Sequence, residues 1–395
     1  MSALLSERYH ELELPEHWPS ALRPEVLRRI DHETPYFVCD LDTIRDRYRR
    51  LETALPGIEC FYALKCNPAT EVVQTLSQLG SSFEIASVGE LRIVQSLGID
   101  PADVIYSNTV KPASHVAAAH EAGVWRFAFD GEGELRKLAD HAPGCAVFVR
   151  LRVDDTTSIF PLSRKFGASA SDAHHLLVTA RNLGLRPYGV TFHVGSQCTS
   201  ASAWRQALTG TGRLLSTLRD DGIELEMLNL SGGFPARYTE PVPTLGEIAG
   251  AIWPALKALL PYVPPRLAVE PGRFLVAESA VVAAGVIGRE MRSGENWIYL
   301  DVGAYNGLIE TRQATHWTYP LWTSRPDHGH SPQEVFTVTG PTCDSSDTLF
   351  PSVRLPSPLG VGDVIYIGSA GAYTLSYGSS FNGFSPPASL FVGAL

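Results

Sequence analysis

The chain has 395 residues, more than the roughly 250 to 300 at which one hydrophobic core stops growing, so we expect two domains. Hydrophobic residues make up 44% of it and charged residues 19%, which is typical of a folded globular enzyme and excludes a largely disordered chain. The formal net charge of -10 argues against nucleic acid and anionic membrane surfaces as partners, and it favours a cationic substrate.

The cysteines form no CxxC pair and show no Cys/His spacing of a zinc site, so we expect reduced thiols and no metal. The first 14 residues do not combine a basic start with an apolar stretch, and no 18 or so apolar residues run together. These features predict a cytoplasmic protein that is not embedded in a membrane. The six cysteines are Cys39, Cys60, Cys66, Cys145, Cys198 and Cys343.

From Tyr36 to about Glu270, short apolar runs alternate with amphipathic helical patterns such as Glu71–Leu79, Val88–Leu97 and Ala201–Leu218. This rhythm predicts an α/β fold, a TIM-like (β/α)8 barrel over residues 36–272, with a doubly wound sheet as the alternative. The predicted strands are Tyr36–Cys39, Glu59–Ala63, Phe83–Ile85, Val104–Ser107, Arg126–Phe129, Ala146–Leu151, Pro187–His193, Met227–Leu230 and Arg266–Val269.

After Glu270 the strands are bounded by Gly, Pro and Ser, with little helical period between them. We therefore predict a second, C-terminal all-β domain, a β-barrel or sandwich, formed by residues 273–395 with residues 1–35 packed against it. Ser324–Gln333 is predicted to be a loop. The predicted strands are Ala277–Ile287, Trp297–Asp301, Glu334–Val338, Val353–Arg354, Val364–Ile367 and Leu390–Val392.

One lysine stands out because it follows an apolar run, in the sequence Phe-Tyr-Ala-Leu-Lys-Cys-Asn-Pro that ends at Pro68. This residue, Lys65, is expected at a strand end in the barrel mouth. Burial lowers the pKa of an ammonium group, and a lysine that can lose its proton is the usual nucleophile for a Schiff base with pyridoxal phosphate. Most lysines are surface charges, so the argument needs further motifs.

Other predicted strand ends also carry polar residues. His193 precedes Val-Gly-Ser, which suits either a structural turn or a backbone facing a ligand. Gly232 and Gly233 follow Ser231 and would let amides approach a phosphate, although a tight turn explains them equally. Glu270 precedes Pro-Gly-Arg, which predicts an acid and a base at the mouth or a salt-bridged domain junction.

In the second domain, Cys343 and Asp344 are adjacent in a loop rich in Gly, Pro and Ser. A cysteine in this setting is either an inert thiol or an exposed acid–base group. Together these motifs resemble, in order, the ornithine/diaminopimelate decarboxylase family, the fold-type III pyridoxal phosphate enzymes, and the ornithine branch most closely. The matching stretches are Tyr62–Asn67, His193–Ser196, Ser231–Phe234, Glu270–Arg273, Gly340–Asp344 and Gly371–Thr374.

The resemblance implies a role for each matching residue. Lys65 would bind pyridoxal phosphate covalently, His193 would stack on its ring, and Glu270 would keep the ring nitrogen protonated so that the ring withdraws electrons. Cys343 would protonate the α-carbon after decarboxylation. Glu84 and Arg150 match further residues around the ring, although aspartate is common at position 84 in the ornithine branch. The implied phosphate contacts are Ser196, Gly232, Gly233, Gly272, Arg273 and Tyr373.

The implied substrate is a basic L-amino acid, with ornithine before lysine, in polyamine biosynthesis. Asp344 would bind its distal amine, and Asp344 and Cys343 would come from the second subunit of a head-to-tail homodimer. The second aspartate of the ornithine branch is missing after Tyr305, so Glu310 is expected to replace it, with Tyr305 also lining the substrate. Diaminopimelate is less favoured, because that branch has Cys-Glu here.

Two alternatives stay open. Arg312 is either a surface charge or a contact for an anionic group on a modified or carrier-linked amino acid. The chain could also be a non-catalytic homologue that binds a regulatory protein. The joint presence of the four residues with implied catalytic roles, Lys65, His193, Glu270 and Cys343, argues against the latter.

Overall fold

The computed structural model describes residues 19–314, 317–324 and 332–393. Contacts divide the chain into two compact units. The barrel unit consists of Ile44–Ala236 and Val242–Leu275. The β-domain consists of the described residues up to Thr43, of Arg237–Pro241, and of the described residues from Val276 onward.

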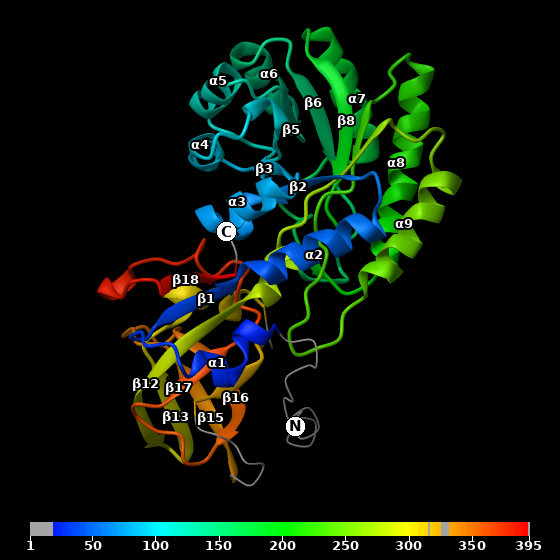
Figure 1. The fold of residues 1–395 in the computed structure, drawn as a ribbon. Coiled ribbons are helices and arrows are strands. Elements are labelled where there is room, and N and C mark those ends of the chain that lie inside the picture. Colours follow the sequence, from blue (N-terminus) through cyan, green and yellow to red (C-terminus); the bar gives the residue numbers. More distant parts are fainter. Residues whose placement is uncertain (1–18, 315–316, 325–331, 394–395) are drawn as a thin grey trace. The chain divides into compact units, whose positions relative to one another are not determined.

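The barrel unit is built on a closed barrel of parallel strands, in the order β10-β11-β2-β3-β4-β5-β6-β8. Figure 1 labels β2, β3, β5, β6 and β8 of this barrel. This closure confirms the predicted (β/α)8 barrel and excludes the doubly wound sheet. Parallel pairing puts the carboxyl ends of all the strands at one mouth. The strands are β2 Glu59–Ala63, β3 Ser82–Ile85, β4 Val104–Tyr106, β5 Arg126–Phe129, β6 Ala146–Leu151, β8 Arg186–Phe192, β10 Met227–Asn229 and β11 Arg266–Val269.

Helices connect successive strands of the barrel, and side-chain hydrogen bonds cap the starts of some of them. Ser87 accepts a bond from the Glu90 amide at the start of α4, and Thr244 and Glu247 form a reciprocal capping box at α9. The helices of this unit are α2 Leu41–Ala54, α3 Thr70–Gln78, α4 Val88–Ser96, α5 Ala113–Glu121, α6 Glu132–His141, α7 Ala170–Asn182, α8 Ser202–Asp220, α9 Leu245–Leu259 and α10 Arg273–Val276, with 3-10 turns η2 Leu64–Cys66 and η3 Pro101–Asp103.

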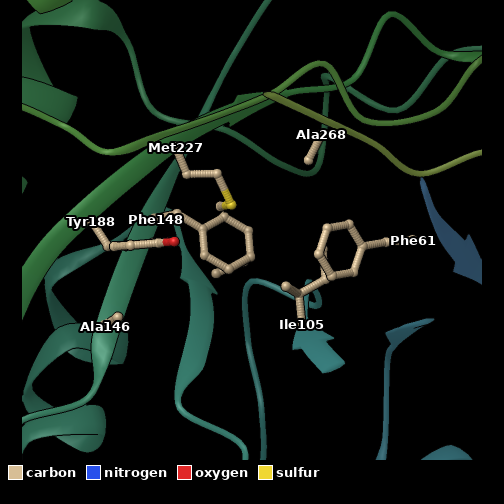
Figure 2. Close-up of a cluster of buried hydrophobic side chains, with 8 residues drawn as sticks. Phe61, Ile105, Ala146, Phe148, Tyr188, Met227 and Ala268 are labelled. Atoms are coloured by element: carbon tan, nitrogen blue, oxygen red, sulfur yellow. The ribbon is translucent and has the colours of Figure 1, made fainter. Parts of the chain in front are cut away.

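The barrel interior is filled by a cluster of apolar side chains from seven strands (Figure 2). Phe61 and Phe148 are fully buried there, and Met227 extends from β10 toward them. Gly189 on β8 lies opposite Met227, and a Cβ at Gly189 would lie only 2.8 Å from the Met227 carbonyl oxygen. The absent side chain at Gly189 therefore makes room for Met227. The cluster consists of Phe61, Ile105, Ala128, Ala146, Phe148, Tyr188, Met227 and Ala268.

The β-domain contains one eight-stranded sheet, with the path β14-β17-β12-β13-β15-β16. It confirms a separate β-rich domain. Strand β1 corrects one prediction: Tyr36–Cys39 was expected in the barrel, but β1 pairs antiparallel with β12 and parallel with β18. The sequence of a buried apolar strand looks the same whichever sheet contains it. Only the strand pairing shows to which sheet β1 belongs. The strands are β1 Tyr36–Asp40, β12 Ala280–Arg292, β13 Glu295–Leu300, β14 Leu321–Thr323, β15 Gln333–Thr339, β16 Thr348–Pro356, β17 Val364–Ile367 and β18 Ala388–Val392.

Several short elements were not predicted. In the barrel unit, β7 Ser158–Phe160 and β9 Ser196–Cys198 form a two-stranded sheet. In the β-domain, a π-helical turn η5 at Ala304–Leu308 leads into α11 Glu310–Gln313, where the sequence predicted little helix. The remaining elements are η1 Ser20–Leu22, α1 Pro24–Leu27, η4 Ala277–Ser279 and η6 Phe381–Gly383.

Two predictions lie partly outside the described residues: the packing of residues 1–35, of which 1–18 are not described, and the loop Ser324–Gln333, of which 325–331 are not described. Within the described ranges, no helix has the length and apolar character needed to cross a membrane.

Gly189→Ala should destabilise the barrel by about 1–3 kcal/mol, because the new methyl group would overpack against Met227. Urea unfolding measures this change in the free energy of unfolding. Gly210→Ala is the matched control: Gly210 lies inside α8 with open space around its Cβ position, so alanine should add about 0.5–1 kcal/mol of stability. Equal stability of the two variants would contradict the packing argument.

Candidate active site

The ends of the barrel strands bring together the barrel residues that the sequence singled out. Lys65 lies in η2, directly after β2, and Ala63 at the end of β2 pairs with Glu84 on β3. Arg150 is on β6, and Glu270 directly follows β11. Because all these strands are parallel, their carboxyl ends place these side chains at one mouth.

Lys65 Nζ donates a hydrogen bond to Glu84 Oε2 and forms an ion pair with it. The lysine side chain is 42% exposed, so it is open to a reactant and is not buried as the sequence suggested. Desolvation acts to lower the Lys65 pKa, but the negative charges of Glu84 and Glu270 outweigh it, so the pKa is raised. In the free protein, Lys65 is therefore held as an ammonium group.

Glu84 is the buried partner of this pair, with 2% of its side chain exposed. Desolvation raises its pKa to about 7, the Lys65 charge opposes that rise, and the nearby charge of Glu270 adds to it. Two carboxylates thus share one lysine at the mouth. Near neutral pH, Lys65 therefore keeps its proton, while Glu84 is close to its own pKa.

Glu270 is held by donors from the carboxyl ends of two other barrel strands, β4 and β10. Ser107, after β4, and Asn229, at the end of β10, donate to Oε1, the latter at 2.7 Å. Ser231 Oγ donates to Oε2 at 2.8 Å, and the Ser231 carbonyl accepts the Glu270 amide. These bonds fix the direction of the carboxylate. Sequence analysis missed Ser107 and Asn229, although each is a polar residue at the end of an apolar strand.

His193 is held as a neutral imidazole. Desolvation and then the charge of Arg150 set its pKa well below the usual value. Its Nδ1 lies 3.0 Å from the Gly195 amide and accepts that hydrogen, which leaves the ring proton on Nε2. A neutral, oriented ring at the barrel mouth suits stacking against a flat aromatic ligand.

An anion site is built beside this ring. Arg273 is 4% exposed, and its Nε and Nη2 donate to Ser196 Oγ at 3.3 and 3.2 Å. Gly233 has φ +97°, and a Cβ there would lie 2.6 Å from the Gly195 carbonyl oxygen, so only glycine lets these two loops meet. A Cβ at Gly232 would lie 3.1 Å from His193 Nε2, which leaves the backbone close to the ring. The guanidinium of Arg273, the hydroxyl of Ser196 and the glycine backbone nearby are together suited to bind a phosphate.

The barrel residues therefore fit pyridoxal phosphate by their chemistry. Lys65 would offer an amine to its aldehyde, Glu270 a carboxylate to its ring nitrogen, and Arg273 with Ser196 a site for its phosphate. A Cβ at Gly272 would lie 2.8 Å from Cys66 Cβ, so this glycine lets the loop after β11 pack on the lysine-bearing turn.

The β-domain brings together a second group. Cys343 is exposed, and its Sγ donates to Asn382 Oδ1 at 3.3 Å. Tyr305 Oη donates to Asp344 Oδ2 at 2.8 Å. The Asp344 pKa is lowered, first by the Ser346 amide and then by the Tyr305 hydroxyl, so this accessible carboxylate stays charged.

Three more predicted residues lie in the β-domain. Glu310 begins α11 and is only 3% exposed, unlike the accessible Asp344. Arg312 is exposed and donates to the Thr348 carbonyl at 3.2 Å. Tyr373 has φ +57° and stacks on Tyr377, with the ring centroids 5.7 Å apart.

Comparison with known proteins identifies the family. Residues 41–277 match the family described as pyridoxal-dependent decarboxylase, pyridoxal binding domain. The lysine/ornithine decarboxylase of Selenomonas ruminantium is 36% identical over 353 residues, which cover 89% of this chain and 88% of that protein.

Solved structures agree. The lysine/ornithine decarboxylase of Vibrio vulnificus complexed with cadaverine is 32% identical with a TM-score of 0.83, covering 91% of this chain and 95% of that one. The arginine decarboxylase of Paramecium bursaria Chlorella virus is 27% identical with a TM-score of 0.88, covering 94% and 100%.

The barrel fold and its mouth thus define an enzyme whose cofactor is pyridoxal phosphate. The chain belongs to the pyridoxal-dependent decarboxylases, in the group that includes the lysine/ornithine decarboxylases, and it is a carboxy-lyase.

Glu84→Gln should make Lys65 react at lower pH, because the substitution removes the nearest negative charge and so lowers the lysine pKa. The measurement is the rate at which the cofactor-free protein takes up pyridoxal phosphate between about pH 6 and 10, followed by the absorbance of the lysine-bound form. Glu59→Gln is the control, because Glu59 begins β2, at the end of that strand away from Lys65, and pairs with Arg266. An unshifted profile for Glu84→Gln would contradict the electrostatic argument.

Proposed function

We propose that this protein decarboxylates L-ornithine, with L-lysine as a second substrate, and releases CO2 and the corresponding diamine. The observation that supports this choice is Asp344, an accessible, charged carboxylate that lies next to the exposed thiol of Cys343. Such a carboxylate suits the distal ammonium of a basic amino acid. The named activity of the Selenomonas relative agrees.

Ornithine and lysine should compete closely. They differ by one methylene, and a pocket distinguishes one methylene by only about 1–3 kcal/mol. Arg312 donates to a backbone carbonyl, which favours a free basic amino acid over a substrate with a further anionic group. We keep Glu310 as a proposed second contact, but its burial makes it secondary to Asp344.

The residues have distinct tasks in this reaction. When bound, the cofactor supplies an electron-withdrawing ring for the electrons of the bond that breaks. Glu270, fixed by its hydroxyl and amide donors, holds a proton at the ring nitrogen. Lys65 fastens the cofactor, and Arg273 with Ser196 orients its phosphate. Cys343 holds a proton at Sγ for the carbon that loses CO2.

We also propose a homodimer in which Cys343 and Asp344 complete the partner's site. Cys343 contacts Asn382, and Asn382 belongs to a segment with large exposed aromatic side chains. Tyr377, Phe381 and Phe384 are 49%, 42% and 38% exposed. Clustered exposed aromatic residues are typical of protein interfaces. We infer a cytoplasmic location, which fits six cysteines that form no disulfide.

A substrate panel tests the choice of substrate, with products identified by mass spectrometry. Wild type should decarboxylate ornithine and lysine but hardly norvaline, which is ornithine without its distal amine. Asp344→Asn should reduce kcat/KM for ornithine roughly 10- to 100-fold, mainly through KM, because a charge-assisted bond is lost. Norvaline turnover should be unchanged in the variant. An equal loss for both substrates would show that Asp344 does not bind the distal amine.

Complementation tests the shared site. Lys65→Ala and Cys343→Ala should each be inactive alone. Mixed in equal amounts, they should form about half hybrid dimers, each with one intact site, so roughly a quarter of wild-type activity should return. Subunit exchange is verified by differently tagged chains. If hybrids form without activity, Cys343 serves the site of its own subunit.

A further inference from the structure

One buried carboxylate in the β-domain has no task in the mechanism above. Asp347 follows the Cys343–Asp344 loop and is 0% exposed. Within the described ranges, no lysine, arginine or histidine forms an ion pair with it. A carboxylate taken out of water without a cation is costly unless hydrogen-bond donors replace the water. Its contacts should therefore show why an aspartate stands here.

The Asp347 side chain connects two segments. Its Oδ1 accepts the Ala304 amide at 2.7 Å. Its Oδ2 accepts the Thr342 amide at 3.1 Å and the Thr342 hydroxyl at 2.8 Å. One side of the carboxylate thus holds the turn that carries Tyr305, and the other holds the residue directly before Cys343.

The Asp347 backbone closes the same loop. Its amide donates to the Asp344 carbonyl at 2.9 Å, and its carbonyl accepts the Gly340 amide at 2.7 Å. The Thr339 hydroxyl also donates to that carbonyl, at 2.6 Å. The loop from residue 340 to 347 is therefore tied at both ends and in its middle by one residue.

Two glycines make room for this arrangement. A Cβ at Gly303 would lie 2.3 Å from Asp347 Oδ1, and a Cβ at Gly340 would lie 2.4 Å from Oδ2. Any side chain at either position would displace the carboxylate. The glycines and the aspartate form one packed unit, in which neither segment can approach the carboxylate unless its facing residue is glycine.

We propose that Asp347 is the positioning residue that sets Cys343, Asp344 and Tyr305 relative to one another. Holding Thr342 and Ala304 on one carboxylate brings the next residues along each segment together, and Tyr305 Oη meets Asp344 Oδ2 at 2.8 Å. The same bonds fix where the Cys343 thiol stands. The expected effect of Asp347 on turnover rests on the proposed function. Its effect on the geometry of the loop does not depend on that function.

The test uses the holoenzyme with Asp347→Asn. The amide is nearly the same size but can accept through one oxygen only, and its NH2 group faces a backbone donor. Thr342→Val is a milder second variant that removes one hydroxyl bond and keeps the aspartate. Asp363→Asn is the matched control, because Asp363 lies in the same domain, outside the 340–347 loop, and caps the Gly360 amide at 2.8 Å.

Two readouts separate positioning from general destabilisation. The first is the alkylation rate of Cys343 by iodoacetamide, located by peptide mapping; the other five cysteines are buried. Cys343 should be alkylated faster in Asp347→Asn than in the wild type. The rate should rise less in Thr342→Val, and it should equal the wild-type rate in Asp363→Asn. The second is kcat/KM for ornithine, which should fall on the order of 100-fold in Asp347→Asn, as expected for misplaced reacting groups.

Folded Asp347→Asn with wild-type alkylation and kcat/KM would overturn the proposal. If Asp347→Asn does not fold, Thr342→Val decides: unchanged alkylation in that variant would likewise overturn it. Should the wild type fail to decarboxylate any basic amino acid, the proposed function fails, but the alkylation rates still test the positioning role. The two failures are thus distinguishable.

Discussion

The anchoring of the Glu270 carboxylate is the constraint on which the barrel site depends. Its donors stand after β4 and at or after β10, while Glu270 itself follows β11. A carboxylate with this many donors is held in one direction, and it also contributes to raising the pKa of Lys65. The closed barrel makes this possible, because only closure brings the ends of β4 and β11 to the same mouth.

Comparison of Lys111 with Lys65 shows that the burial of a lysine alone does not identify its function. Lys111 is fully buried, and its pKa is lowered to about 8, chiefly by desolvation. It nevertheless donates to two backbone carbonyls and pairs with Glu134, so its hydrogens are engaged in structure. Lys65 is accessible, and its pKa is raised because it faces the carboxylates of Glu84 and Glu270. The reactive lysine is distinguished by access and charge partners.

The chemistry is divided between the two units. The barrel unit carries the residues suited to the cofactor, and these are held by strand ends. The β-domain carries the thiol and the carboxylate proposed for the substrate, and these stand on a loop whose shape depends on Asp347. A loop can vary in its side chains without disturbing the sheet, which suits a surface that selects among basic amino acids.

The sequence by itself determined the eight barrel strands, the change to a β-rich second domain and the motifs around Lys65, Glu270 and Cys343, because alternating apolar runs and strand-end residues are local patterns. Only the tertiary structure decided that β1 pairs with β12 and β18, since a buried strand does not specify its partner. It also decided that Ser107 and Asn229 meet Glu270, and that Asp347 joins Thr342 to Ala304. These contacts connect residues that are distant in sequence or ordinary in type, and closure of the barrel and packing against glycine create them.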